Sequence, residues 1–278
     1  MNEVGDLMPE LPEVETVKNA LKKEVLNKKI TSVKVYWDNI IAFPNVEEFK
    51  KQLKSQTINN IKRRGKWLMF ELDDYYLLSH LRMEGKYLIR KTNEPKEKHQ
   101  HVIFSFSDNT DLRYHDTRKF GKMYLIKKND IYNQKPLKDL GLEPWDNDLT
   151  SKYLKQKLKD KPIKTELLDQ SIITGIGNIY ADEILFKAKI NPQTKAKSLA
   201  ENDLENIIKY TRQILTMAIK DGGTTIKSYT SQEGVHGKYQ DRLQIHTKKT
   251  CPICKNKIKK ITVNGRGTYY CENCQKER

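Results

Sequence analysis

The strongest constraint on the fold lies near the end of the chain, where all four cysteines fall within the last 28 residues. They form two Cys-x-x-Cys pairs that are sixteen residues apart: Cys251, Cys254, Cys271 and Cys274. Thiolates at this spacing supply the four ligands of a tetrahedral Zn²⁺ ion, and four protein ligands leave no open position, so the predicted ion is structural. Lys257–Val263 and Thr268–Tyr270 alternate like hairpin strands, with Asn264–Gly267 as their turn. The sequence therefore predicts a zinc ribbon; two disulfides or free thiols are the disfavoured alternatives.

The composition favours a polyanionic partner. The net charge is +16, from 52 Lys and Arg against 36 Asp and Glu. Nucleic acid is the usual partner for such an excess, and a Lys-rich composition without a binding role is the alternative. Only ten of the basic residues are Arg. Several of these lie in compact segments flanked by Gly or aromatic residues, as bidentate contact to phosphate or base requires: Arg63, Arg64, Arg82, Arg118 and Arg266.

Neither a membrane span nor a secretion signal is predicted. The chain has no run of 18 apolar residues, and Met1–Leu7 is acidic without an apolar core. All cysteines are assigned to the metal site, so none is left for a disulfide elsewhere. We therefore expect a cytoplasmic protein.

Hydrophobic periodicity divides the chain into a β-rich half and a helical half. A helix is predicted from Leu11 until Asn27 and the following lysines end it. From Ile30 to about Ile126 the chain is predicted to form short strands, which favour a sandwich or barrel: Ile30–Trp37, Thr57–Ile61, Lys66–Leu72, Tyr75–Leu81, His101–Phe106, Asp111–Tyr114 and Lys122–Ile126. After a polar linker, Lys128–Asp148, the predicted helices are Thr150–Lys159, Ile163–Ser171, Ile179–Ala188 and Leu199 to about Lys220, the last with a capping box from Ser198 to Glu201.

Several motifs in this order resemble the formamidopyrimidine-DNA glycosylase family of bacterial repair enzymes. Met8–Thr16 is similar to the family's N-terminal signature, and Gly175–Glu183 to its central motif. Further matching segments are Arg63–Lys66, His80–Gly85, Asp116–Gly121, Leu168–Gln170, Gly222–Lys227 and Gly265–Thr268. The resemblance covers nearly the whole chain, from Met8 to Gln275.

The resemblance implies an α+β multidomain fold and a DNA partner. An N-terminal helix is expected to pack on an eight-stranded β-sandwich, followed by a helix–two-turn–helix domain and the zinc ribbon. We expect a catalytic β-sandwich domain over residues 9–135, a DNA-binding helical domain over 150–227, a lesion-recognition loop and connector over 228–244, and the ribbon over 245–278. The implied partner is double-stranded DNA containing oxidised purines or abasic sites, held in the cleft between the halves. The implied cofactor is one structural Zn²⁺, and we expect a monomer.

Pro9 matches the family's nucleophile, which is the N-terminal residue once methionine is removed. A free N-terminal proline is a secondary amine, partly unprotonated near neutral pH because α-amino groups titrate near about 8. Its attack on C1′ of the deoxyribose displaces the damaged base and leaves an iminium, an electron sink for β- and then δ-elimination. The resemblance makes Glu10 the general acid/base that protonates the opening sugar ring, and Glu13 an orienting neighbour. A favourable charge at a helix N-terminus is the alternative for both.

Phosphate contacts are implied for four further residues. The resemblance places Lys66 and Arg266 in the catalytic set. It makes Lys66 a phosphate clamp near the lesion, for which a solvated lysine at a strand edge is the alternative. His80, Asn178 and Arg266 match the remaining phosphate contacts. Asn178 stands at a Gly-rich turn that opens a helix, where backbone N–H groups favour an anion. A simple N-cap is a compatible alternative for Asn178. Arg266 lies between two glycines at the ribbon's tip; a phosphate contact is expected there, and an exposed turn arginine is the alternative.

Met83, Arg118 and Phe120 resemble the residues that fill the gap left by an everted nucleotide. The enzyme must extrude the damaged base to reach C1′. Arg118 is expected to bond the orphaned cytosine while Met83 and Phe120 wedge into the stack; core packing is the alternative for these two. Lys227 and the loop Ser228–Arg242 match the region that covers the flipped base, and Glu84 is a candidate for touching the lesion.

Seven residues precede Met8. An amide bond to a preceding residue removes the lone pair of the Pro9 nitrogen, so a chain translated from Met1 and left untrimmed is expected to be inactive. We hypothesise that translation starts at Met8, which the codons upstream of it would check.

Two other functions stay open. An endonuclease VIII-like glycosylase for oxidised pyrimidines shares the implied fold and the Pro-Glu start, although the spelling of Pro9–Thr16 favours the purine branch. A substrate panel separates the two enzymes. A non-catalytic DNA-binding protein, with Pro9 permanently blocked, would bind lesion duplex without forming a covalent adduct.

Overall fold

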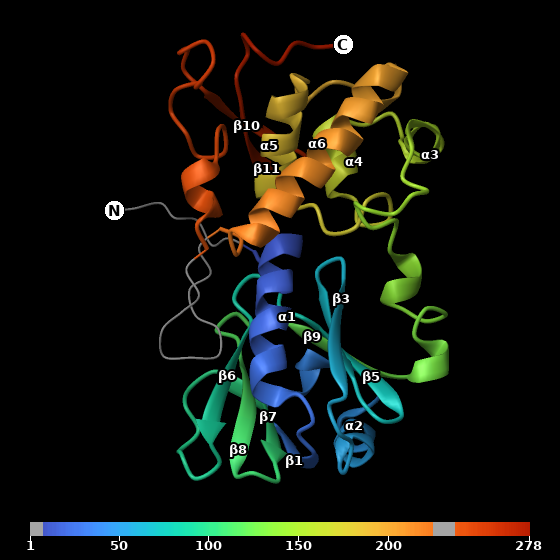
Figure 1. Ribbon diagram of the computed structural model, residues 1–278, viewed down its shortest axis with the longest axis vertical. Helices are drawn as coiled ribbons and strands as arrows, with labels where there is room; N and C mark the ends of the chain where they lie inside the picture. Colours follow the sequence, from blue (N-terminus) through green and yellow to red (C-terminus); the bar gives the residue numbers. More distant parts are fainter. Residues whose placement is uncertain (1–7, 225–236) are drawn as a thin grey trace. The chain divides into compact units, whose positions relative to one another are not determined.

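The computed structural model describes residues 8–224 and 237–278, which fold as two compact units (Figure 1). Of the described residues, the sandwich unit contains 8–9 and 13–138. The helical unit contains 10–12, 139–224 and 237–278. No helix in these described ranges is long and apolar enough to cross a bilayer.

The sandwich unit holds two sheets and helix α1 (Leu11–Val25), of which Leu11 and Pro12 belong to the helical unit. One sheet has the strand order β1-β7-β8-β6 and the other β2-β9-β5-β4-β3. All pairings are antiparallel except that of the short β2 with β9. The strands are β1 (Ile30–Val35), β2 (Ile41–Phe43), β3 (Asn60–Arg64), β4 (Trp67–Glu71), β5 (Tyr75–His80), β6 (Lys86–Lys91), β7 (Gln100–Phe106), β8 (Thr110–His115) and β9 (Lys122–Lys127).

One apolar core joins α1 to both sheets. Val17 and Leu21 of α1 are 0% exposed and lie in the same cluster as Leu68 and Phe70 of β4. The alternate spacing along β4 directs one face of the strand to the core, as the period of two requires. The helix contributes residues at three- and four-residue steps, which form a single stripe. The predicted helix-plus-sandwich architecture is therefore confirmed, although the two sheets of the described residues hold nine strands, four and five, rather than the expected eight.

The expectation of strands alone between Ile30 and Ile126 is wrong at one place. Val46–Leu53 forms helix α2, whose N-cap Asn45 accepts a hydrogen bond from the Glu48 N–H at 2.9 Å. Phe49 and Leu53, four residues apart, bury the inner side of this helix. An Asn N-cap before an amphipathic turn is a helix start signal that the strand prediction overlooked.

Other strand boundaries also differ from the prediction. β2 and β6 were not predicted, and β3 begins at Asn60 rather than Thr57. The Thr57 N–H donates to the Asp73 carboxylate at 2.8 Å instead of joining the ladder along β4. A side-chain acceptor in the neighbouring turn thus shortens the strand.

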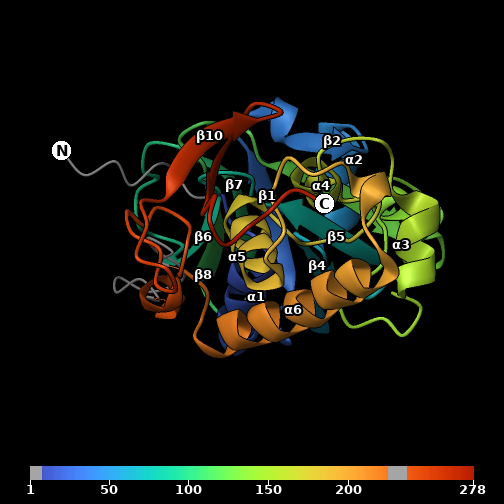
Figure 2. The same cartoon turned by 90° about the horizontal axis from the view of Figure 1, so that it is seen from above.

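The helical unit is built around α5, which packs against α4, α6 and the ribbon strand β11 (Figure 2). Nearly all of its side chains are buried, as expected of a helix covered on every side. The elements are α3 (Ser151–Lys157), α4 (Ile163–Leu168), α5 (Asn178–Ala188), α6 (Glu201–Lys220), β10 (Lys259–Val263) and β11 (Arg266–Tyr270). Short 3-10 turns complete both units: η1 (Asp38–Ile40), η2 (Lys128–Asp130), η3 (Leu137–Asp139), η4 (Ala196–Ser198) and η5 (Tyr239–Arg242).

Two local predictions in the helical unit are wrong. The capping box from Ser198 to Glu201 does not form, because Ser198 lies in η4 and its hydroxyl donates to the Lys195 carbonyl. Asp203 instead accepts from the Ala200 N–H at 3.2 Å. The ribbon turn is also tighter than predicted. Asn264 and Gly265, both at positive φ (46° and 73°), connect the strands, as in a two-residue hairpin.

Candidate functional site

A buried carboxylate shapes the loop between β8 and β9 in the sandwich unit. Asp116 is 0% exposed and accepts from the N–H groups of Arg118 (3.0 Å) and Gly121 (2.8 Å). Lys119 between them adopts φ 59°, a left-handed conformation that costs energy for a residue with a side chain. Phe120 is 49% exposed, with the Arg118 guanidinium 5.1 Å from its ring centre. The core-packing alternative for Phe120 is therefore wrong.

The loop that carries Met83 is built in a similar way. Arg82, directly before Met83, also adopts a left-handed conformation, at φ 55°. The hydroxyl of Tyr114 occupies the space that a Cβ would need at either of two glycines: it would lie 2.2 Å from a Cβ at Gly85 and 1.7 Å from a Cβ at Gly121. The loops that carry Met83 and Phe120 therefore both pack against one buried tyrosine. The Met83 side chain itself is only partly buried.

His80 ends β5 as a neutral hydrogen-bonding group. Its Nδ1 accepts from the Arg82 N–H at 3.0 Å, which leaves Nε2 to carry the ring proton. Burial, followed by the positive charges of Arg82 and Lys66, lowers the pKa of His80 to about 3. The Trp67 ring lies edge-on at 4.8 Å and fixes its plane. His80 can therefore contact an anion as an N–H donor without being a cation. Lys66, 6% exposed, stands directly before β4.

In the helical unit, the Glu10 carboxylate lies at the N-terminus of α5. It accepts from the N–H groups of Ile179 (2.9 Å) and Tyr180 (3.4 Å). The partial positive charge of a helix N-terminus stabilises a carboxylate there. A Cβ at Gly177 would lie 2.2 Å from Glu10 Cδ, so glycine is required for this approach. Glu10 thus caps α5. Pro9 directly precedes it in the chain and is buried.

The first turn of α5 is bonded to the ribbon hairpin. Gly177 is the N-cap of α5, so the N-cap alternative for Asn178 is wrong. The Asn178 Nδ2 donates to the Gly267 carbonyl at 3.0 Å, and its Oδ1 is buried with no hydrogen-bond partner within the described parts of the chain. Arg266, next to Gly267, is exposed and opens β11. Glu10, Asn178 and Arg266 therefore all belong to the helical unit, around the first turn of α5 and the ribbon hairpin bonded to it.

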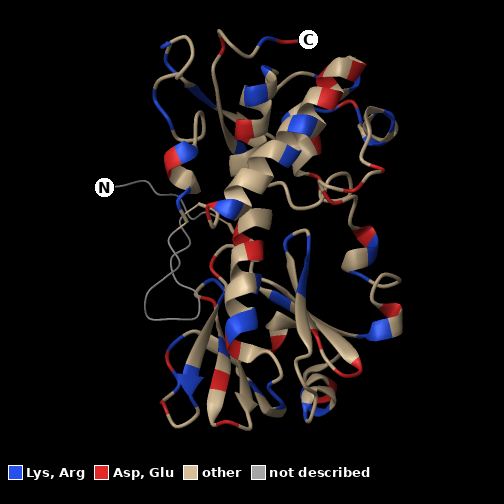
Figure 3. Ribbon diagram, viewed as in Figure 1, with Lys and Arg blue, Asp and Glu red and all other residues tan. Residues whose placement is uncertain are grey.

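Other predicted residues differ in how far the structure describes them. Glu13 is 3% exposed and Glu84 is half-buried beside Met83. Lys227 and the loop segment up to His236 lie outside the described residues. Figure 3 shows that basic residues occur in both units, interleaved along the chain with acidic ones. The sequence did not predict the supporting roles of Tyr114 and Asp116, which hold these loops. Asp116 stands in a matching motif, and Tyr114 had no signal beyond the glycines that it contacts.

The four cysteines fit a single tetrahedral metal ion. Their Sγ atoms all lie within 4.8 Å of one another. The Cys251–Cys274 and Cys254–Cys271 sulfur separations are 3.8 Å and 3.4 Å. A disulfide needs about 2.05 Å, whereas Zn–S bonds of about 2.3 Å place tetrahedral sulfurs at roughly this spacing. The chain therefore has one structural zinc site, which closes the ribbon and leaves no position for a reactant.

Three family descriptions match successive parts of the chain. Residues 8–123 match the formamidopyrimidine-DNA glycosylase N-terminal domain, and residues 140–230 match the H2TH domain of the same glycosylase. Residues 248–276 match the zinc finger found in formamidopyrimidine-DNA glycosylase and isoleucyl-tRNA synthetase. Together these matches cover most of the sequence.

Full-length relatives agree with these matches. The formamidopyrimidine-DNA glycosylase of Bacillus subtilis is 46% identical, covering 98% of this chain and 100% of that protein. That of Oceanobacillus iheyensis is 46% identical over 96% of this chain and 98% of its own. The Lactococcus lactis Fpg bound to DNA with an N7-benzyl-Fapy-dG has a TM-score of 0.90 at 41% identity, covering 97% of this chain and 100% of that one. Its complex with abasic-site DNA gives 0.90 at 40% identity, with the same coverage.

Proposed function

Because the chain belongs to the formamidopyrimidine-DNA glycosylase family, we propose that it excises oxidised purines from double-stranded DNA and then cuts the strand with the Pro9 amine as nucleophile. 8-Oxoguanine and formamidopyrimidines are the expected bases, and abasic sites are expected substrates of the strand-cutting step. The observation that carries this proposal is the Glu10 carboxylate, fixed at the N-terminus of α5 and covalently next to Pro9.

The proposed chemistry uses two neighbouring residues. The lone pair of the free Pro9 nitrogen attacks C1′, the bond between C1′ and the damaged base breaks with its electron pair going to the base, and the departing base takes the N–H proton of the former amine. Glu10 gives a proton to O4′ as the sugar ring opens, which leaves a positively charged iminium between the nitrogen and C1′. Loss of a C2′ proton then expels the 3′ phosphate, and a second elimination expels the 5′ phosphate. The two N–H bonds from α5 fix the Glu10 carboxylate in one place between these steps.

The remaining predicted residues bind and distort the duplex in this proposal. Lys66, His80, Asn178 and Arg266 contact phosphates, His80 as a neutral donor and the two basic residues as cations. Met83 and Phe120 enter the stack where the damaged nucleotide has turned outward, while Arg118 bonds the base left opposite. The exposure of Arg118 and Phe120 and the partial exposure of Met83, on loops with left-handed backbone, support this role. Zn²⁺ bound to the four cysteines contributes structure alone.

The protein is proposed to act as a monomer in the cytoplasm, on the DNA of the nucleoid. The division of its C-terminal half into a helical domain, a lesion loop with connector, and the ribbon stays a prediction. Lys227 belongs to that proposed lesion loop.

Borohydride trapping tests the proposed function. Protein made from Met8, which exposes Pro9 once methionine is removed, is incubated with duplex DNA holding 8-oxoguanine opposite cytosine, and protein made from Met1 serves as the blocked control. The proposal expects a covalent band with the Met8 protein and none with the Met1 protein. Trapping only on duplexes with oxidised pyrimidines would favour the endonuclease VIII-like alternative. Binding by both proteins without any adduct would favour a non-catalytic DNA-binding protein.

A further inference from the structure

Three buried polar side chains from distant parts of the helical unit converge beneath the ribbon hairpin. Lys164 of α4 donates to Asp182 Oδ1 of α5 at 2.6 Å, and His246 Nδ1 lies 2.7 Å from Asp182 Oδ2. The side chains of Lys164 and Asp182 are 0% exposed, and that of His246 is 6% exposed. Burial lowers the pKa of Lys164, and the Asp182 carboxylate opposes this change. A buried cluster of this kind is favourable only when every member is bonded.

The cluster is bonded to the segment that carries Arg266. Lys164 Nζ donates to the Gly267 carbonyl at 3.1 Å and to the Thr268 hydroxyl at 2.8 Å. The Thr268 hydroxyl in turn donates to the Arg266 carbonyl at 2.9 Å. Asp182 Oδ2 also accepts from the Tyr269 N–H at 3.2 Å. The backbone on the C-terminal side of the exposed Arg266 is therefore held by one buried ion pair and its partners.

His246 completes the bonding of this ion pair. A carboxylate accepts hydrogen bonds only, so Nδ1 must carry the hydrogen that faces Asp182. The His246 ring also lies edge-on to Tyr269, with 5.0 Å between the ring centres. Without the imidazole, Asp182 Oδ2 would keep only the longer bond from Tyr269. A buried carboxylate that lacks a hydrogen bond attracts Lys164 or water more strongly. Because Lys164 also bonds Gly267 and Thr268, its displacement would shift the hairpin backbone.

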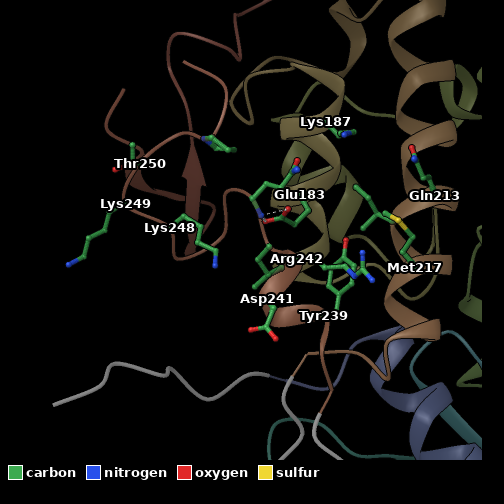
Figure 4. Close-up of a pocket in the computed structure, with 14 residues that line it drawn as sticks. Glu183, Lys187, Gln213, Met217, Tyr239, Asp241, Arg242, Lys248, Lys249 and Thr250 are labelled. Carbon is green, nitrogen blue, oxygen red and sulfur yellow. Dashed lines mark hydrogen bonds between the residues drawn. The ribbon is translucent and has the colours of Figure 1, made fainter. Parts of the chain in front are cut away.

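The chain around His246 is fixed independently of its side chain. Glu183 accepts the N–H groups of Gln244, Ile245 and His246 at 2.9 Å each. Figure 4 shows Glu183 with dashed lines for its hydrogen bonds to another residue of the pocket wall. Glu183 and Gln244 lie in the wall of a pocket of about 700 Å³. Thr247, which follows, is β-branched and yet adopts φ 62°. Left-handed backbone at a β-branched residue is strained and persists only where the surroundings determine it.

We propose that His246 is a positioning residue for DNA binding: through Asp182 and Lys164 it fixes the hairpin backbone that aims Arg266 at a DNA phosphate. This inference rests on the proposed function, because it assumes that Arg266 contacts DNA. It adds a residue without a role in the proposed chemistry, and its loss should weaken binding only while Arg266 is present.

A double-mutant cycle tests this coupling. The zinc-loaded full chain is titrated by fluorescence anisotropy with a short duplex that carries a tetrahydrofuran abasic-site analogue. Arg266→Ala is expected to weaken binding about tenfold, as loss of one charge-assisted phosphate contact does, and to lower the slope of log K against log salt by about 1. In His246→Gln the side-chain amide reaches the position of Nε2 and not that of Nδ1, so the bond to Asp182 is lost. We expect this variant to weaken binding about fivefold, because the Arg266 contact with the phosphate is then misaligned.

Two further variants decide between positioning and general destabilisation. His246→Asn places an N–H donor at the Nδ1 position, and we expect its affinity to stay within about twofold of the parent's. In the Arg266→Ala background, His246→Gln should have no further effect. Losses that multiply in the double variant would overturn the proposal, including losses caused by a variant that no longer folds. Unchanged affinity in the Arg266→Ala single variant would instead show that Arg266 does not contact DNA, and this result would overturn the positioning role as well.

Discussion

The sandwich unit and the helical unit hold their exposed side chains by different physical means. In the sandwich unit, Phe120 and Met83 extend from loops whose backbone is bent around Asp116 and Tyr114. In the helical unit, Arg266 starts a regular strand that rests on a buried ion pair between Lys164 and Asp182. The first arrangement depends on close backbone packing and the second on charge balance. Substitutions that are harmless in one unit should therefore be damaging in the other.

The largest effect is expected from removing one charge of the buried pair. Asp182→Ala leaves Lys164 buried without its counter-charge, which costs about 3–5 kcal/mol of the free energy of unfolding of the helical unit. Hydrogen exchange of the slowest amides in this unit measures the loss. Asp203→Ala is the matched control, since Asp203 is also nearly buried but bonds a helix N-terminus, and it should cost about 1 kcal/mol.

A paired replacement separates charge from packing in that result. Lys164→Met with Asp182→Leu removes both charges together, and we expect it to recover most of the stability that Asp182→Ala loses. A double variant as unstable as the single one would show that the ion pair is not the cause.

Added volume should be damaging in the sandwich loops and tolerated in the hairpin. Gly121→Ala places a Cβ 1.7 Å from the Tyr114 hydroxyl, which should cost about 1–3 kcal/mol. Tyr114→Phe in the same chain removes the nearest atom and should recover part of this loss. Gly267→Ala is the control, because nothing lies within 4 Å of its added Cβ. Equal destabilisation by the two alanines in denaturant unfolding would remove the contrast between the units.

His80 should make the sandwich unit lose stability as the pH falls. Its folded pKa is about 3, below the unfolded value near about 6.5. Between these values only the unfolded chain takes up the proton, so stability is full above about pH 6.5 and falls toward about pH 3 by up to ~1.4 kcal/mol per pH unit. His80→Asn keeps an acceptor for the Arg82 N–H and should remove this dependence. An NMR titration in which the His80 ring takes up a proton near pH 6 would contradict the assignment.

The smallest effect is expected from relieving backbone strain. Lys119→Gly removes the side-chain clash at φ 59° and should raise the free energy of unfolding by up to about 1 kcal/mol. Ser55→Gly, at φ 72° in an exposed turn away from the loops, should give a similar gain. Only Lys119→Gly should weaken binding to lesion duplex, because it frees the segment between Arg118 and Phe120. Equal DNA affinity in both variants would show that the strain has no role in binding.

The two units also differ in how much of them the sequence reveals. Metal spacing and periodicity are local signals, so the zinc cysteines, α1 and most helices could be predicted. The eight-residue α2 was missed because it lies in a run of strands and its start signal is one Asn. The cluster of Lys164, Asp182 and His246 was invisible, because its members are up to 82 positions apart and each alone is typical of an exposed residue.

The site itself was only partly predictable, for the same reason. The motifs that contain glycine predict which residues contact DNA. They do not indicate what supports these residues: Tyr114 filling the space beside Gly85 and Gly121, or Glu10 capping α5 against Gly177. These are long-range contacts that only the folded chain brings together.

Mass-spectrometric mapping of the borohydride-reduced adduct tests the central claim most directly. Protein made from Met8 is trapped on duplex DNA that contains 8-oxoguanine, digested with a protease and a nuclease, and searched for the peptide that carries the sugar remnant. We predict that the remnant is attached to the nitrogen of Pro9, at the start of the N-terminal peptide. A remnant on the side chain of Lys66 or another lysine would contradict the account, because the Pro9 amine would then not be the nucleophile.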